Sequence, residues 1–518
     1  MKVIAKSLVE FAYYLILTLA GMILSFFALQ SLLGGAYIPI RIAEGISFYQ
    51  QPWYFYLLLP CFFVFLFLLH KPLERISAKR LFLVASLVYI LGAAYLIYFS
   101  TGIIRADAKH VFNAALAFNQ GDYSSLTKVG AYMYRNPHQL GLLSLERLYQ
   151  WIYPATQLVF CFNLLFALGN NYLLYRISDL LWSRDRLNKY CILLSFLFLP
   201  QFFFILFAYG SIVGIFFALL ALYFLIQFNQ NNQIFYALGA SFALAAACLI
   251  RNNYFIFGLT LLVCLLLSSL NDFKWKKIVA LGLLLFSISL PNRLISNYYE
   301  GQIGRKIGEG TPKISYITMG LRDDPNRQTL GGWYDAYNTK ILKRNKYNEK
   351  KAEEMAKKDL LLLIQNFVQH PDYAAKFFYE KVKSTWLEPS FQSIWTGPQL
   401  ERKQKTQTKL LQSLYEEKIG YKIFNSYAMV FLSSLYLLLA AFLIHRLFWA
   451  QQALRPFSLY PYIFFLGGFF FHLVWETKSQ YVFVYILLLI PTMARSVDWS
   501  VERINQILAQ LKTRQKDF

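Results

Sequence analysis

The residues best suited to chemistry stand in short polar stretches between long apolar runs. The first stretch reads RADAKH and places Asp107 close to Arg105, Lys109 and His110. A carboxylate at such a position can take the proton of a hydroxyl group, and general-base catalysis of this kind contributes roughly 10²–10⁴-fold. The same pattern also fits a solvated loop in which Asp107 pairs with Arg105 or Lys109.

A second polar stretch, RNPHQ, covers Arg135 to Gln139. Proline favours the first turn of a helix, so His138 and Gln139 are expected at a helix N-terminus, where backbone N–H groups attract anions. The segment 138–152 is amphipathic and is typical of a helix lying in the membrane interface. An interfacial anchor that binds no ligand fits this stretch equally well.

Two further polar stretches follow apolar runs near their ends. Arg251 and Asn252 come after the run 233–250, and the stretch HLVWETKSQY contains Glu476, Lys478, Gln480 and Tyr481. Arginine and lysine at these positions predict a phosphate clamp, because arginine binds phosphate with two N–H groups and lysine acts as a point charge. Cations that only reach toward lipid headgroups are the alternative.

The elements that must position these residues are membrane helices. Of the 518 residues, 57% are hydrophobic, and the mean hydropathy is +0.39. These values exclude a disordered chain, a disulfide-rich secreted scaffold and an ordinary soluble enzyme. A membrane span needs about 20 mainly apolar residues. About twelve spans are expected, near 8–31, 53–70, 81–99, 154–175, 190–209, 211–228, 233–250, 254–270, 278–295, 424–444, 457–474 and 480–494.

Basic residues orient these spans. Lysine and arginine gather in 71–80, 176–189, 271–277 and 495–518, which the positive-inside rule places in the cytoplasm together with both termini. The four polar stretches then share the opposite, extracytoplasmic face. The chain is expected to divide into N-terminal spans at 1–80, a core at 81–295 that includes an external loop at 100–153, an extracytoplasmic domain at 296–423 that is mainly helical, C-terminal spans at 424–494 and a basic tail at 495–518.

This arrangement resembles the GT-C glycosyltransferases, a superfamily that includes protein O-mannosyltransferases and the aminoarabinose transferase of lipid A. The resemblance rests on RADAKHV after a span, on NPHQLGL at 136–142 and on LIRNN at 249–253. GDYSSL, GGWYDAYN and HLVWETKSQY are similar to segments of integral membrane proteins from Gram-positive bacteria that are assigned to this superfamily. The similarity covers roughly 80–510, and the first two spans look like an addition to its core.

The resemblance implies a membrane enzyme that transfers a sugar from a polyprenyl-phosphate donor to an envelope glycan, glycolipid or protein. Asp107 would be the general base, the other residues named above would bind the donor phosphate or substrate, and the anomeric centre would invert. Trp333 and Tyr334 would stack on the acceptor, or else pack within their domain. Many relatives carry a second carboxylate at the turn that reads AYGSIVG here, with Ser211, so no cofactor and no metal are expected.

Two rival functions remain open at this stage. A ligase that moves a lipid-linked polymer, such as a teichoic acid, onto a glycolipid would need a similar external face. A lipid-sugar flippase would need polar residues across the bilayer, which the apolar span centres argue against. We attribute one part of the net charge of +23 to the basic cytoplasmic segments that orient the spans. The other part is expected to form an extracytoplasmic surface for anionic substrates and membrane lipids, and it does not indicate affinity for nucleic acid.

Overall fold

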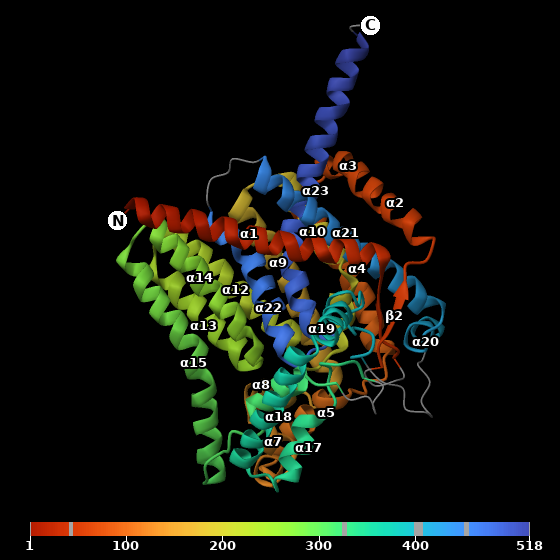
Figure 1. Ribbon diagram of the computed structural model, residues 1–518. Helices are drawn as coiled ribbons and strands as arrows, with labels where there is room; N and C mark the ends of the chain where they lie inside the picture. Colours follow the sequence, from red (N-terminus) through yellow and green to blue (C-terminus); the bar gives the residue numbers. More distant parts are fainter. Residues whose placement is uncertain (1, 41–44, 324–328, 398–407, 450–454, 517–518) are drawn as a thin grey trace.

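The protein is a bundle of apolar helices with a polar, mainly helical cap at one end (Figure 1). This computed structural model describes all residues except 1, 41–44, 324–328, 398–407, 450–454 and 517–518. Within the described residues, ten helices are long and apolar enough to cross a membrane, and a bent pair makes up to eleven. The chain is therefore an all-α polytopic membrane protein, apart from one small hairpin.

The bundle contains the apolar segments expected from the sequence. Its helices are α1 (Lys2–Leu33), α2 (Phe55–Leu68), α3 (His70–Arg75), α4 (Ala78–Phe99), α9 (Thr156–Trp182), α10 (Asp185–Leu197), α11 (Leu199–Phe203), η2 (Phe204–Leu206), α12 (Ser211–Asn231), α13 (Ile234–Ile250), η3 (Asn252–Tyr254), α14 (Phe255–Asn271), α15 (Trp275–Ile303), α21 (Ile419–Phe448), η4 (Pro456–Leu459), α22 (Tyr460–Val474) and α23 (Ser479–Lys516).

Two of the twelve expected spans are not single helices of full length. The expected span at 190–209 bends by 50° between α10 and the α11–η2 segment. Pro200 lies at the start of α11, where a proline is tolerated but cannot continue the preceding helix. The helix α13 has only 17 residues, which is just below the usual length of a span, and unlike α2, α14 and α22 it is not continued by an adjoining short helix in the same span.

The cap is built from two separate parts of the sequence. The first loop forms α5 (Ala106–Asn119), α6 (Ser124–Thr127), α7 (Tyr132–Arg135), η1 (Pro137–Gln139) and α8 (Leu140–Ile152). The second forms α16 (Lys313–Gly320), α17 (Tyr337–Arg344), α18 (Glu349–Gln369), α19 (Pro371–Trp386) and α20 (Lys409–Tyr415). The expected amphipathic helix at 138–152 and the mainly helical character expected for 296–423 are therefore confirmed for the described residues.

A short antiparallel hairpin joins α1 to α2. Its strands are β1 (Gly34–Tyr37) and β2 (Ser47–Gln50), with Gly34 opposite Gln50. The backbone N–H of Ala36 donates to the carbonyl of Leu387, which follows α19. The N-terminal helices are thus tied to the cap as well as to the bundle.

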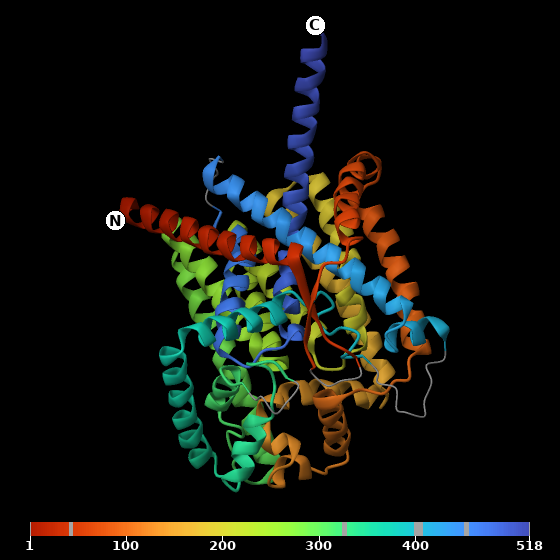
Figure 2. The same ribbon diagram turned by 45° about the vertical axis from the view of Figure 1, so that its right-hand side comes forward.

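The two ends of the bundle carry different groups. The helix α23 extends from the bundle toward the C-terminus on the side away from the cap (Figures 1 and 2). Its Asp498 carboxylate contacts the guanidinium groups of Arg184 and Arg186. This contact joins the basic segment 176–189 to the basic tail at one face. The cap, with α5, α8 and α18, lies at the other end (Figure 1).

Candidate functional site

A cavity of about 800 Å³ lies where the cap meets the bundle. Its wall contains most of the residues that the sequence singled out, and they come from five separate segments. These lining residues are Arg105, Asp107, His110, Arg135, His138, Gln139, Arg251, Asn252, Tyr334, Glu476, Lys478, Gln480 and Tyr481. The fold therefore brings the four polar stretches of the sequence together around one space.

Two predicted residues lie elsewhere. Lys109 points to the exposed side of α5 and does not line the cavity. Trp333 is 1% exposed, and its indole N–H donates to the Ser384 hydroxyl at 2.9 Å. Its ring packs beside Trp395, so the alternative of packing within the cap replaces the expected stacking on an acceptor sugar.

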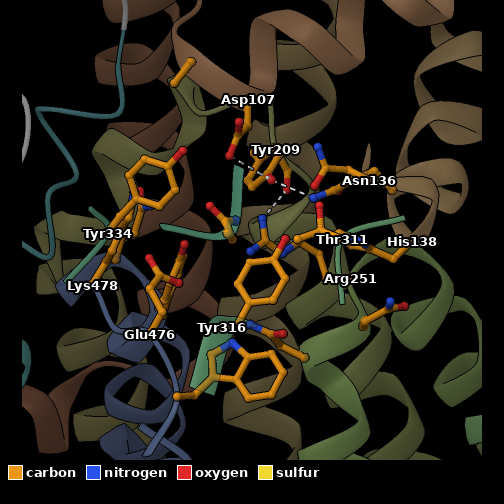
Figure 3. Close-up of a pocket in the computed structure, with 18 of the residues that line it drawn as sticks. Asp107, Asn136, His138, Tyr209, Arg251, Thr311, Tyr316, Tyr334, Glu476 and Lys478 are labelled. Atoms are coloured by element: carbon orange, nitrogen blue, oxygen red, sulfur yellow. Dashed lines mark hydrogen bonds between the residues drawn. The ribbon is translucent and has the colours of Figure 1, made fainter. Parts of the chain in front are cut away.

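Tyr209 connects the two sides of the polar wall, and sequence reasoning missed it. Its hydroxyl accepts a hydrogen bond from Gln139 Nε2 at 2.7 Å and donates to Asp107 Oδ2 at 3.5 Å (Figure 3). Arg251 donates to the Tyr209 carbonyl at 2.9 Å, and its guanidinium lies 4.4 Å from the centre of the Tyr209 ring. One tyrosine thus contacts both Asp107 and Arg251, the residues predicted as base and phosphate ligand.

The backbone around Tyr209 depends on a glycine. Gly210 has φ +72°, in the left-handed region, and directly precedes α12. A Cβ atom at this position would meet Ile250 and Leu142 side chains at 2.8 Å. Glycine therefore lets the α11–α12 turn close tightly against α8 and α13, which carry neighbouring parts of the cavity wall.

Asp107 stands in the first turn of α5, where the positive end of the helix dipole favours an acidic side chain. Behind it, the Arg105 guanidinium lies 4.3 Å from the centre of the Trp395 ring and donates to the Trp395 carbonyl. Burial lowers the pKa of Arg105 to about 10, which still leaves it charged at neutral pH. Arg105 is thereby fixed as a charge at the edge of the cavity.

The wall beside Arg251 is cationic but contains a neutral imidazole. The His138 side chain faces the cavity. Burial disfavours the charged form of its ring, and the nearby Arg251 adds to this effect, so the pKa of His138 falls to about 4. Lys313 from α16 adds a further cation to the lining, one that the sequence did not single out. Arg135 is held by Thr339, whose hydroxyl accepts from its Nη1 at 3.0 Å.

The opposite wall is formed by the turn between α22 and α23. Glu476 and Lys478 project from this turn, with Lys478 Nζ 4.8 Å from the centre of the Tyr334 ring (Figure 3). The backbone N–H of Glu476 donates to the carbonyl of Tyr316 at 3.0 Å. The Tyr316 ring in turn stacks on Trp475 with centres 5.7 Å apart. The second cap segment is thus docked directly on the turn.

A buried lysine stabilises this docking. Lys381 of α19 donates to the carbonyls of Gly320, Leu473 and Trp475, the last two at 2.9 Å each. Burial lowers the pKa of this amine to about 7. From the sequence, Lys381 looked like one of several cations on an amphipathic helix, and no local signal distinguished it.

Apolar side chains from four membrane helices also line the cavity. Cys248, Phe255, Ile288 and Phe471, from α13, α14, α15 and α22, form an apolar recess, and the ring centres of Phe255 and Phe471 lie 6.0 Å apart. Asn292 Nδ2 donates to Asn252 Oδ1 at 2.9 Å, which joins α15 to the turn that carries Arg251. The site therefore combines a charged chamber with an apolar recess among membrane helices, a combination suited to an amphipathic ligand.

The chain matches no protein-family model, no curated protein and no solved structure. Among the residues that the structure describes, no three His, Cys, Asp or Glu side chains gather as they would around a metal ion.

Proposed function

We propose that the protein transfers a sugar from a polyprenyl-phosphate donor to a hydroxyl group of an envelope acceptor, on the face of the membrane that carries the cap. The observation that carries this proposal is the link through Tyr209 between a carboxylate and an arginine, above an apolar recess. A donor of this class has three parts: a prenyl chain, a phosphate and a sugar. The cavity offers an environment for each of them.

Each of the three parts of the donor would contact a different part of the cavity wall. Its prenyl chain would enter the recess of Phe255, Ile288 and Phe471, where burial of apolar surface contributes about 25 cal/mol per Å². Its phosphate would meet Arg251 and Lys313, and the neutral His138 ring can donate one further hydrogen bond. The sugar would then project between Asp107 and the turn with Glu476 and Lys478.

The transfer would be a single displacement. Asp107 takes the proton from the acceptor hydroxyl while the acceptor oxygen forms a bond to the anomeric carbon. The bond between this carbon and the phosphate oxygen breaks, and its electron pair stays on the polyprenyl phosphate. Arg251 stabilises the charge that develops on the leaving phosphate. Attack from the side opposite the leaving group inverts the anomeric centre.

Ligand binding tests the proposal without knowledge of the sugar. The protein in lipid nanodiscs is titrated with undecaprenyl phosphate and, separately, with undecaprenol, and binding is followed by native mass spectrometry. We expect saturable binding of the phosphate, weaker binding of the alcohol, and at least about 10-fold weaker phosphate binding in Arg251→Ala. Lys306→Ala removes an exposed cation from the cap end and serves as the matched control.

Equal binding of the two lipids, or binding of the phosphate that is unchanged in Arg251→Ala, would contradict the assignment of this cavity to a polyprenyl phosphate. Equal losses in Arg251→Ala and Lys306→Ala would point to a general effect of surface charge and would also contradict it.

A further inference from the structure

The corner between α18 and α19 exposes an apolar surface that does not line the cavity. At the end of α18, Leu361 is 61% and Val368 is 76% exposed, with Leu362 and Ile364 exposed beside them. Leu361, Ile364 and Val368 are spaced i, i+3 and i+7, so they form one stripe along the helix. A stripe of this kind is expected to be covered, because a lone apolar face in water is unfavourable.

The helix α19 lies against the cap-side half of a membrane helix. The Tyr379 hydroxyl donates to Gln30 Oε1 of α1 at 2.7 Å, and the Tyr379 ring lies 6.4 Å from that of Phe26. Further along α19, Trp386 stacks on Phe27 with ring centres 5.6 Å apart. These contacts place α19 beside the apolar part of a membrane span, not above it.

The end of α1 that α19 contacts also exposes leucines. Leu29 and Leu33, at the end of α1, are 64% and 63% exposed, as expected for a helix that faces lipid. Figure 2 shows the α18–α19 corner level with the cap-side ends of the bundle helices, at its left-hand edge. The end of α18 that meets α19 therefore lies beside the bundle, near the part of α1 that α19 contacts.

Two exposed lysines lie near the apolar stripe. Lys358 precedes it by less than one turn on α18, and Lys376 on α19 lies with its Nζ 3.9 Å from Glu380 Oε1. An apolar helix face bordered by lysines is typical of segments that rest in a membrane interface, where the lysines meet anionic headgroups.

We propose that the α18–α19 corner inserts its apolar stripe into the leaflet on the cap side of the membrane, so that lipid covers Leu361, Leu362, Ile364 and Val368. The cap is then held at the membrane at a second place, besides its direct connections to the bundle. Because Lys381 of the same α19 binds the carbonyls of Leu473 and Trp475, this anchor also fixes the height of the cavity wall. The inference does not depend on the chemistry proposed for the cavity.

Photo-crosslinking tests this contact. The photoreactive residue p-benzoylphenylalanine replaces Leu361 or, in a second variant, Val368, and the full-length protein is irradiated in nanodiscs that contain alkyne-tagged phosphatidylglycerol. Leu87 on α4, which is 58% exposed, gives the lipid-facing reference, and Lys350 at the other end of α18 gives the solvent-facing control. All four variants must elute as the unmodified protein does.

We expect lipid adducts at positions 361 and 368 within about 3-fold of the yield at 87, and at least about 10-fold above the yield at 350. Adduct yields at 361 and 368 as low as at 350 would overturn the proposal. An adduct with twice the mass of the chain would overturn it as well, because a second copy would then cover the stripe.

Discussion

The hydroxyl of Tyr209 offers the sharpest test of how the cavity works. Tyr209→Phe removes one oxygen atom and keeps the ring on which the Arg251 guanidinium rests. The variant loses the hydrogen bond from Gln139 at 2.7 Å and the contact with Asp107 at 3.5 Å. Tyr209→Leu is the matched control, because it removes the hydroxyl and the aromatic face together.

The size of the effect follows from these contacts. A hydrogen bond to a charged group contributes about 1.5–3 kcal/mol, and the long 3.5 Å contact with Asp107 belongs at or below the lower limit. We therefore expect a loss of about 1–1.5 kcal/mol in transition-state stabilisation, which is roughly a 5–12-fold lower kcat. Donor KM should stay within about 2-fold in Tyr209→Phe, since Arg251 keeps its aromatic partner. In Tyr209→Leu the lost cation–π contact, worth about 0.5–2 kcal/mol, should raise donor KM as well.

The assay uses purified protein in nanodiscs, a panel of undecaprenyl-phosphate-linked hexoses and an envelope acceptor fraction. Initial rates are measured against donor concentration for the three proteins. A Tyr209→Phe variant with normal kcat would refute the role of the hydroxyl in holding Asp107. An equal rise in donor KM in Tyr209→Phe and Tyr209→Leu would refute the assignment of donor binding to the aromatic ring and of the kcat effect to the hydroxyl.

Three further predictions concern groups around the cavity. Lys381→Met leaves three carbonyls without their donor, at about 1 kcal/mol or more each, so it should lower the thermal midpoint by several degrees; Lys376→Met at an exposed site should not. His138 stays neutral above about pH 4, so wild type and His138→Gln should bind undecaprenyl phosphate with the same pH profile between 5.5 and 8, and a step near 6.5 lost in the variant would count against this. Glu146 is buried with no hydrogen-bond partner among the described residues, which raises its pKa well above the usual value. Because the unfolded carboxyl ionises near 4.5, wild type should lose stability as the pH rises above 4.5 while Glu146→Gln does not, and thermal unfolding at pH 5 and 8 measures the difference.

The membrane helices were predictable because hydrophobicity alone identifies them. Each expected apolar segment coincides with a helix of the bundle, and the helix at 138–152 is where its amphipathic pattern placed it. The bend between α10 and α11 was not foreseen, although Pro200 marks it. An apolar run does not reveal whether a proline inside it ends one helix or starts the next.

The site was predictable where residues stand at helix ends on one face. Asp107, Arg251 and Lys478 belong to short polar stretches beside apolar runs, so topology alone brings them toward one another. Tyr209 lacked such a signal, because tyrosine is common in this chain and its role depends on contacts with residues 70 and 102 positions away. Trp333 carried a signal that did not correspond to its position. An aromatic residue in a polar loop predicted stacking on a sugar, yet its side chain fills the interior of the cap.

The role of Asp107 as general base is best measured by the rate of sugar transfer in Asp107→Asn. The amide keeps the size of the carboxylate but cannot take the proton of the acceptor hydroxyl. We expect the variant to bind undecaprenyl phosphate nearly as well as the wild type and to transfer sugar at least roughly 10²-fold more slowly. Transfer from purified lipid-linked donor at the unmutated rate would show that Asp107 is not the base and would contradict the proposed mechanism.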